Sequence, residues 1–555
     1  MVTLHETEVD GVRCFWVETG RPTLSALLAF RAGMVDEHIT ENGFQHVLEH
    51  LALNGRGGGA LHVNGQVGLL ETIFQAHGPA ELVTSHLRDL SQWLAEPRLG
   101  DLDKERRILQ AEAAARGSNP GSRALGWRYG AEGPGLVAYD DVATGRATPV
   151  LLRERAARVF TAGNAVLIMD GPPPADLRLE LSPGDLLAVP KAVPCETRYP
   201  AMYVDDGGLC VSGEVPRSAA MTLGAELLRQ QLEDQFRHQD GHAYSPSSMY
   251  ERVDADSAVV AGVTDVRPDA YPTLLGRTLA LVRRMRAYEP ESDKLAALQA
   301  SQVQAMTDPY SSLGVATRAG IDSLMGRPIV SLDEMVEEVR AVTPSDVVKG
   351  FERLHATMLV GVPGATIYAG EVRRLEAPTS RPSVRGRTWR SVNWPGDKSR
   401  LRISDDAVEL ANGQTARSVS GRDVHAMLAY ENGLRHVVTR DGYGLLINPH
   451  GWRRGASAVT KLDELVPEDR RLPHPSIDGL EQGVKAGFLR RWSEPVARRL
   501  RNGGFWILLL VIGSLIAWIG GIALFIYSQT YSIAGLWGIL GARWMYGLLF
   551  GSSDD

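Results

Sequence analysis

The sequence is short of cysteine and has no dominant charge. Its 555 residues include three cysteines, Cys14, Cys195 and Cys210, and an odd, widely spaced set does not form a disulfide-stapled secreted scaffold. The formal net charge is −7, which excludes a strongly basic surface over the whole chain, so we expect no nucleic-acid partner. The N-terminal residues show no basic segment followed by an apolar one, so no secretory signal is visible.

One long stretch has no charge at all. The 23 residues from Phe505 to Tyr527 contain no Asp, Glu, Lys or Arg, and a helix of that length can cross a bilayer core of about 30 Å. Residues 485–501, just before it, hold six basic residues and one acidic residue. By the positive-inside rule, we expect a cell-membrane protein with a single-pass C-terminal anchor at 505–527 and its preceding domains in the cytoplasm. The apolar tail, 528–555, is compatible with an interfacial helix or a second span.

The first 365 residues contain two stretches that end alike. Thr148-Pro149 precedes an expected helix and a strand at 166–168, and Thr343-Pro344, 195 residues later, precedes the same pair with its strand at 358–360. This repeat predicts two α/β domains of similar plan, at 1–190 and 196–365. The alternative is that two α/β domains merely share generic patterning. From the periodicity of apolar residues we expect strands in 1–30, 164–174 and 257–265, and helices at 43–53, 86–96, 103–116, 221–236 and 291–306.

Three further segments precede the charge-free run. Residues 366–392 are rich in Arg, Pro, Ser and Thr, which is typical of a linker. Residues 393–467 contain short β-runs separated by Asn-Gly and Asp-Gly turns, which predict a small all-β module. Residues 468–504 form a basic juxtamembrane connector. The hairpin order and the segment DGYGLLINPHGW make the module similar to a bacterial pleckstrin-homology (PH-like) fold, and the alternative is a simple β spacer or interaction domain.

One pentad combines metal-binding residue types: His46-Val47-Leu48-Glu49-His50. On a helix, His46 and His50 lie one turn apart on one face, so both imidazoles can bind one ion, and Glu49 projects to the same side. Two histidines and a water leave a tetrahedral zinc ion in need of one more protein ligand. Glu105 and Glu112, two helical turns apart in ERRILQAE, could supply that carboxylate. The alternative is that both are solvated surface charges.

The pattern HxxEH followed by ERxxILxE resembles the inverzincin peptidases of the M16 type, the group of pitrilysin, insulysin and mitochondrial processing peptidase. The segment AFRAGMVDEHITENGFQHVLEH is similar to that family's strand, glycine turn, acidic loop and helix. The resemblance implies that His46, His50 and Glu112 bind Zn²⁺ and that Glu49 is the catalytic general base. Glu105 matches the family's carboxylate that supports a zinc-binding histidine.

A second match lies in FRHQDGHAY, where Arg237 and Tyr244 have six residues between them. The family carries an Arg and a Tyr at this spacing, and they reach the active site from the facing domain. The resemblance implies that Tyr244 donates a hydrogen bond to the tetrahedral oxyanion, and that Arg237 holds the substrate backbone or positions Tyr244.

The chain departs from the family pattern in two places. Only 61 residues separate His50 from Glu112, fewer than usual in the family. The missing residues fall near 54–66, where the family usually has a helix. Glycines 57–59 suggest a short, tight connection in its place. The family's Asn-Ala pair on the substrate-binding edge strand is not evident in GLLETIFQAHG, residues 68–78.

The sequence thus predicts an α+β protein with two M16-type α/β-roll domains, a small all-β module and a C-terminal transmembrane helix. The resemblance implies a zinc-dependent endopeptidase that cleaves peptides or unfolded precursor segments at the membrane surface, through a zinc-activated water with Glu49 as general base. Substrate would add to an exposed sheet edge. The chain is expected to pair as a homodimer or with another M16-like chain. The rival interpretation is a non-catalytic, M16-like peptide-binding or scaffold subunit of a membrane complex.

Overall fold

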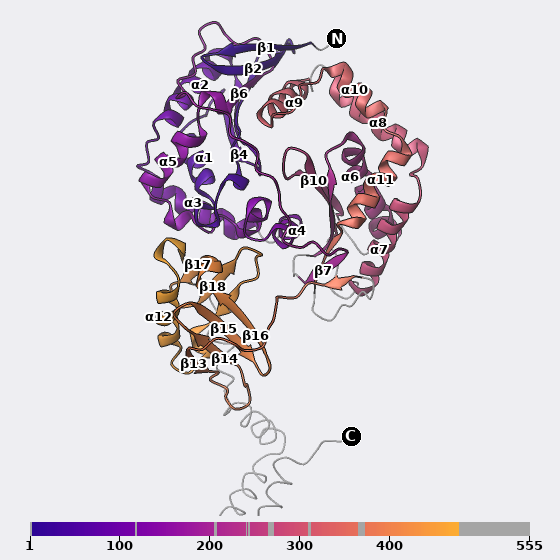
Figure 1. The fold of residues 1–555 in the computed structure, drawn as a ribbon. Helices are drawn as coiled ribbons and strands as arrows, with labels where there is room; N and C mark the ends of the chain where they lie inside the picture. Colours follow the sequence, from indigo (N-terminus) through magenta and orange to yellow (C-terminus); the bar gives the residue numbers. More distant parts are fainter. Residues whose placement is uncertain are drawn as a thin grey trace, which may run out of the picture.

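The computed structural model describes residues 3–116, 119–204, 208–239, 241, 245–264, 271–308, 312–363 and 372–476. They form a first lobe (3–190), a second lobe (196–375) that faces it, and a β module (380–476) that lies below the first lobe in Figure 1. The expected connector from residue 477 on, the expected transmembrane helix, the apolar tail and Tyr244 lie outside the described residues. Within the described ranges, no helix combines the length and apolar character that a membrane crossing requires.

The first lobe is a six-stranded sheet with helices packed on it. Its strands are β1 Leu4–Val9, β2 Val12–Val17, β3 Leu24–Phe30, β4 His62–Val67, β5 Thr72–Gly78 and β6 Ala165–Met169, and its helices are α1 Phe44–Leu53, α2 Ala80–Ala95, α3 Leu102–Arg116, α4 Pro120–Tyr129 and α5 Pro149–Val159. The strand order is β1-β2-β6-β3-β5-β4, with β2 and β6 parallel and the other neighbours antiparallel. Phe30, Leu48 and Phe160 are buried in the core between sheet and helices.

The second lobe repeats this plan. Its strands are β7 Ala201–Val204, β8 Leu209–Pro216, β9 Ser247–Arg252, β10 Ser257–Thr264, β11 Leu359–Val362 and β12 Arg373–Arg374. Its helices are α6 Ala219–Leu232, the π-helix η6 Glu233–Gln239, α7 Tyr271–Ala287, α8 Ser292–Thr307, α9 Leu313–Leu324, α10 Leu332–Arg340 and α11 Pro344–Ala356. The order β12-β7-β11-β8-β10-β9, with β7 and β11 parallel, matches the first sheet strand for strand except at β12. That strand comes from the segment expected to be a linker.

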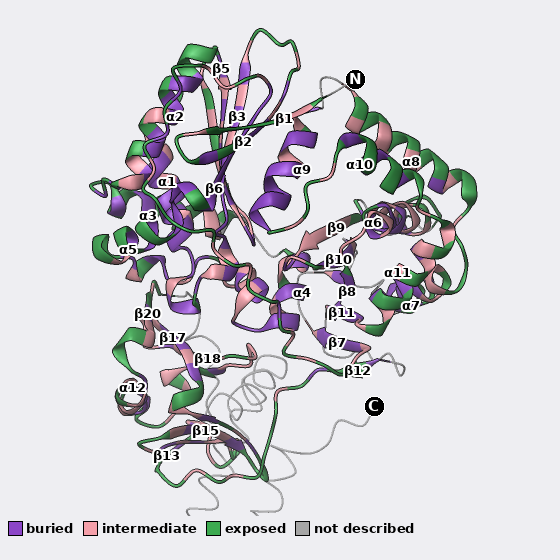
Figure 2. Ribbon diagram, turned by 45° about the horizontal axis from the view of Figure 1, so that its top comes forward, coloured by how far each residue is buried: buried purple, intermediate pink, exposed green. Residues whose placement is uncertain are grey.

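Each lobe covers the other's sheet with one helix. Helix α9 of the second lobe packs on β2 and β6 of the first sheet, where Ala316 and Ala319 are buried beside Phe15 and Ile168 (Figure 2). Helix α4 of the first lobe packs in turn against β8 and β11 of the second sheet. This exchange holds the lobes face to face, with β4 on the side of the first lobe that faces the second (Figure 1).

The β module contains two four-stranded sheets. Their strands are β13 Arg387–Arg390, β14 Arg400–Ile403, β15 Ala407–Asn412 and β16 Thr415–Ser420 in one sheet, and β17 Val424–Tyr430, β18 Arg435–Thr439, β19 Leu445–Ile447 and β20 Arg471–His474 in the other. The prediction of an all-β module is wrong, because Gly455–Leu465 forms helix α12. Its buried residues Ala458 and Leu462 follow helical spacing and belong to the module's core.

Candidate metal centre

Helix α1 carries three of the candidate site residues, and a buried acid holds its N-terminus. Glu37 accepts hydrogen bonds from the backbone N–H groups of Gly43, at 2.9 Å, and Gln45, at 2.8 Å, which satisfies two donors that a helix start leaves unpaired. Gly43 has a φ of 98°, and a Cβ there would lie 2.7 Å from the Cβ of Asp141. This position therefore requires glycine, and the start of α1 is fixed against the loop that carries Asp141.

Helical spacing places His46, Glu49 and His50 together on one side of α1. The neighbouring face packs into the core through Val47 and Leu48. Glu49 Oε2 lies 4.0 Å from His46 Nε2 and 3.9 Å from His50 Nε2. The prediction that the pentad forms one cluster on a helix is confirmed, since each of the three residues offers an atom within 4.8 Å of the others.

Helix α3 brings Glu112 to the same two nitrogens. Glu112 Oε1 lies 3.6 Å from His50 Nε2, and Glu112 Oε2 lies 4.0 Å from His46 Nε2. The side chain of Glu112 is 43% exposed, against 8% for Glu49. Both imidazoles therefore direct Nε2 toward a point between one buried and one accessible carboxylate.

The other nitrogen of each ring contacts a buried carboxylate. His46 Nδ1 lies 2.8 Å from Asp141 Oδ2, and His50 Nδ1 lies 3.3 Å from Glu105 Oε2. A carboxylate accepts hydrogen bonds, so each Nδ1 carries the proton and each Nε2 presents its lone pair to the cluster. Metal-binding histidines in proteins are oriented in this way.

This donor set fits a zinc ion. Imidazole nitrogens and carboxylate oxygens are ordinary zinc ligands, and two ligands about 2.0–2.1 Å from one ion lie roughly 3.3–3.4 Å apart at a tetrahedral angle. The 3.6 Å between His50 and Glu112 and the 4.0 Å between His46 and Glu112 are close to that separation. The two lone pairs are fixed beforehand by Asp141 and Glu105, so little rearrangement is needed to bind an ion.

Glu49 is the buried acid of the cluster. Burial raises the pKa of Glu49; the charges of Glu112 and Glu105 also raise it, whereas His50 and His46 lower it. A carboxylate with a raised pKa accepts a proton more readily, which is the property that a general base needs.

Strand β4 is the last strand of the first sheet and passes directly beside Glu49. A Cβ on Gly65 would lie 1.9 Å from Glu49 Oε1, so the carboxylate rests against the backbone of this strand. His62, Asn64 and Gln66 are exposed and alternate with half-buried residues. Because an edge strand offers backbone hydrogen-bonding groups, an extended peptide could add to the sheet next to Glu49.

The location of this edge differs from the sequence-based expectation. The Asn-Ala pair is expected within residues 68–78, but that segment forms β5, an inner strand. The edge strand β4 lies instead at the end of the segment expected to be a short glycine-rich connection. Gly57, Gly58 and Gly59, which lead into β4, have φ values of 83°, 116° and 61°. Asn64-Gly65 is the pair beside Glu49, and the alternation of HVNGQV is the signal that could have identified it.

Asp141 is a site residue that the sequence analysis missed. Asp140 and Asp141 have φ values of 47° and 59°, so the chain turns sharply here. No local motif marks the residue, because it lies 95 positions from His46, its hydrogen-bond partner. Only the tertiary fold brings this loop to the start of α1.

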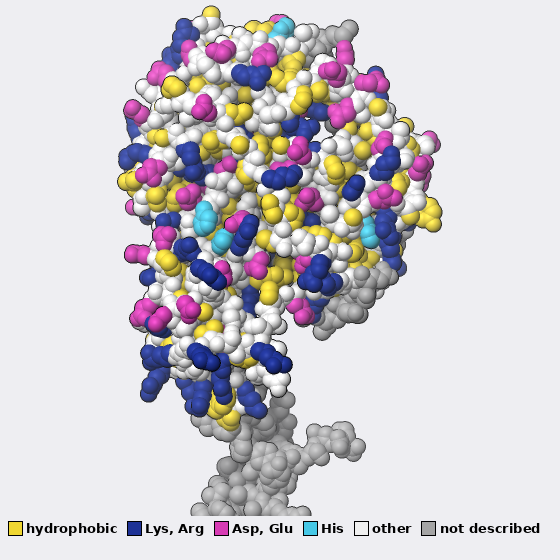
Figure 3. All heavy atoms as spheres, viewed as in Figure 1, with side chains coloured by type: hydrophobic (Ala, Val, Ile, Leu, Met, Phe, Trp, Pro, Cys, Tyr) yellow, Lys and Arg dark blue, Asp and Glu magenta, His cyan; other side chains and the backbone are white. Residues whose placement is uncertain are grey.

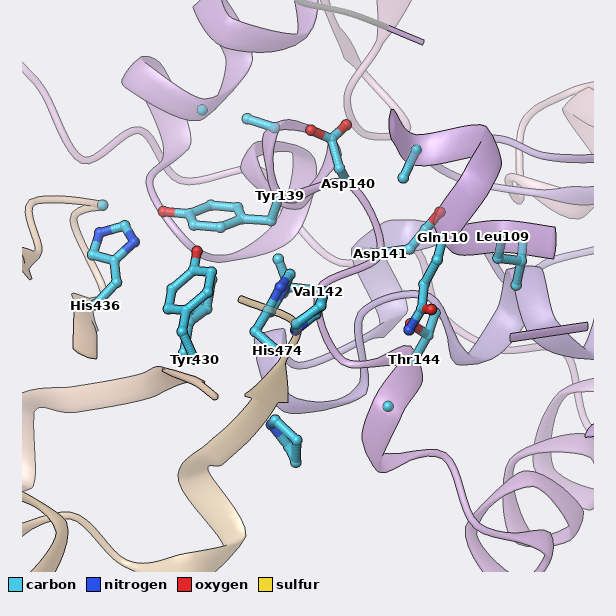
Figure 4. A pocket seen from close by; sticks show the side chains of 18 of the residues that line it. Leu109, Gln110, Tyr139, Asp140, Asp141, Val142, Thr144, Tyr430, His436 and His474 are labelled. Atoms are coloured by element: carbon cyan, nitrogen blue, oxygen red, sulfur yellow. The ribbon is translucent and has the colours of Figure 1, made fainter. Parts of the chain in front are cut away.

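A cavity of about 580 Å³ lies between this loop and the β module. Tyr139 projects into it from the first lobe, and Tyr430 and His474 face it from the module (Figure 4). Nearby, Glu132 accepts hydrogen bonds from His425 Nε2, at 2.8 Å, and Arg440 Nε, at 2.7 Å. The β module is thus tied to the part of the first lobe that leads to Asp141.

Of the two site residues predicted in the second lobe, Arg237 is among the residues that the structure describes. Arg237 lies on the π-helix η6, and its Nη1 donates a hydrogen bond to Glu233 Oε1 at 2.9 Å. Such π-helical turns often occur at functional sites. Tyr244 lies outside the described residues, so the joint role of Arg237 and Tyr244 stays a prediction.

No protein-family model and no curated protein matches the chain. Among solved structures, a protease from Helicobacter pylori is 15% identical with a TM-score of 0.55, covering 66% of this chain and 100% of its own. The M16 inactive domain from Pseudomonas fluorescens is also 15% identical, with a TM-score of 0.54 and the same coverages. An M16-like peptidase from Alicyclobacillus acidocaldarius is 16% identical with a TM-score of 0.50, covering 65% of this chain and 99% of its own. At these identities the likeness shows a common fold, so the M16-type fold that the sequence predicts is confirmed.

Proposed function

We propose that this chain is a zinc-dependent endopeptidase that cleaves peptides or unfolded precursor segments at the membrane surface. One observation carries the proposal: His46 and His50 direct their Nε2 atoms to one point beside Glu112, while Asp141 and Glu105 hold both Nδ1 atoms. The fold alone does not require a buried carboxylate beside the Nδ1 atom of each of two neighbouring histidines.

His46, His50 and Glu112 would hold the zinc ion. When bound, zinc lowers the pKa of a water molecule and polarises the scissile carbonyl. Glu49 is kept apart from the ligand set because it is the buried carboxylate with the raised pKa and lies against the β4 backbone. It accepts the proton of the attacking water and passes it to the nitrogen of the leaving group.

A substrate peptide would extend β4. Backbone pairing along His62–Val67 aligns the peptide without reading its side chains, and places its backbone beside Glu49. Arg237 and Tyr244 of the second lobe would close on the peptide from the opposite side, Tyr244 donating to the developing oxyanion. The chain would work as a homodimer or with another M16-like chain, anchored by 505–527 with its lobes in the cytoplasm.

The second candidate is a peptide-binding or scaffold subunit without activity. The 43% exposure of the Glu112 side chain favours it, because a loosely held third ligand weakens metal binding. The similar domain from Pseudomonas fluorescens is itself described as inactive. In this case the lobes would hold a peptide at β4 while a partner subunit cleaves it.

The test is Glu49→Gln in the full chain. The substitution keeps the size of the side chain but removes the base, so zinc content should stay at the wild-type level while hydrolysis of a peptide library is lost. Glu154→Gln, an exposed position on α5, is the matched control and should cleave normally. Unchanged cleavage by Glu49→Gln would refute the mechanism, and loss of zinc from this variant would show that Glu49 is a ligand instead.

A further inference from the structure

The β13–β14 end of the β module is strongly basic. Residues 381–402 contain seven Lys or Arg residues and one acid, Asp397. Figure 3 shows Lys and Arg side chains gathered at the end of the β module that points away from the lobes. One of the seven, Arg402, is neutralised by the buried Glu409, and the remaining six outnumber the one acid of this segment.

Two of these arginines are placed directly opposite each other. Arg390 on β13 pairs in register with Arg400 on β14, and like charges at opposed positions destabilise a sheet. Within the ranges that the structure describes, neither guanidinium forms an ion pair with a carboxylate. Both lie over the ring of Trp394, with Cζ 5.1 Å from its centroid for Arg390 and 5.3 Å for Arg400. Both guanidinium groups therefore contact one indole ring.

Of the neighbouring groups, one adds to this charge and one offsets part of it. Arg453 donates from Nη2 to the carbonyl of Trp394 and from its backbone N–H to the carbonyl of Arg390, so a third guanidinium lies beside the pair. The carboxylate of Asp397 accepts a hydrogen bond from the backbone N–H of Ser399, at 2.9 Å. Three guanidinium groups and one carboxylate thus lie at this end of the module, so the site stays net positive and would attract an anion.

We infer that this end of the β module is a docking surface for anionic phospholipid headgroups, with a phosphate bound between Arg390 and Arg400. Guanidinium groups match phosphate oxygens in geometry and charge, and tryptophan suits the interface between lipid and water. A lipid surface is favoured over a nucleic acid because the chain is acidic overall and carries the charge-free run 505–527. Bound in this way, the module would lie between the membrane and the two lobes.

The experiment uses a chain that ends at Ser476, because the run 505–527 would hold any variant on any vesicle. The residues of the module's buried core lie between Trp389 and Leu472, so this chain keeps the described packing. Co-sedimentation is measured with vesicles of phosphatidylcholine alone and of equal parts phosphatidylcholine and phosphatidylglycerol. Wild type should bind the anionic vesicles only, and less tightly as salt is raised.

Arg390→Gln with Arg400→Gln should weaken binding to the anionic vesicles about 30-fold, with no loss of thermal stability because the opposed charges are removed. Arg153→Gln with Arg158→Gln, two exposed arginines on α5, makes the same change in net charge and should bind as wild type. Arg390→Lys with Arg400→Lys keeps the charge but not the planar guanidinium, so its binding should lie between that of wild type and that of Arg390→Gln with Arg400→Gln. Equal binding by both glutamine pairs, or binding that does not depend on phosphatidylglycerol, would overturn the inference. Tighter binding to duplex DNA than to anionic vesicles at the same salt concentration would overturn it too. Cleavage by the full chain is a separate readout, so failure here leaves the proposed peptidase activity untouched.

Discussion

Asp141 offers a sharp test of how the candidate metal site is built. It contacts His46 at 2.8 Å, lies 95 residues away in sequence and carries no other sign of function. In Asp141→Asn the side chain keeps its size, and Asn tolerates the left-handed φ of 59° at this position. The neutral amide, however, binds the Nδ1 proton more weakly, and if its NH₂ group faces Nδ1 it favours the wrong tautomer of His46.

Loss of such a supporting carboxylate usually costs 10–100-fold in metal affinity, which is about 1.4–2.7 kcal/mol. The contact is short and Asp141 is 8% exposed, so we expect the upper part of that range. Zinc affinity is measured by competition with a chromophoric chelator, on the purified full chain. Melting curves of the metal-free proteins show whether the fold is intact.

Asp140→Asn is the matched control. Asp140 also has a positive φ, of 47°, and undergoes the same chemical change, but it is exposed and His46 contacts its neighbour instead. Its zinc affinity should stay within about twofold of wild type. An Asp141→Asn protein with wild-type zinc affinity would refute the reasoning, and so would an equal loss in both variants.

Two other predictions concern buried groups. Glu105→Gln should lower zinc affinity less than Asp141→Asn, about 3–10-fold, because its contact with His50 is longer, at 3.3 Å; a larger loss than for Asp141→Asn in the same titration would contradict this. Burial, with a smaller effect from Arg56, lowers the pKa of His86 to about 4. The unfolded chain therefore binds this proton first as pH falls, so stability should drop between pH 6.5 and 4, by about 3 kcal/mol. His86→Leu should lose this acid sensitivity in chemical denaturation curves, and an unchanged pH dependence would refute it.

The sequence predicts the part of the site that lies on single helices. His46, Glu49 and His50 fall on one face because of helical spacing alone, and Glu105 and Glu112 on another for the same reason. The repeated order of strands and helices likewise depends on local periodicity, so it is visible in the sequence.

Features that depend on tertiary contacts are not visible in this way. Asp141 reaches His46 only because its loop packs on Gly43, and the edge strand β4 was hidden by the glycines that precede it. The exchange of α4 and α9 between lobes leaves no pattern, since a helix buries the same kind of residue on either sheet. Helix α12 is missed because turn signals on both sides favour strands.

The most direct test of the central claim is the metal content of the purified full chain, measured together with cleavage of a mixed peptide library. The account predicts about one zinc ion per chain and cleavage that a chelator abolishes and added zinc restores. A protein that binds no zinc and cleaves no peptide, yet melts cooperatively, would contradict it and support the scaffold subunit.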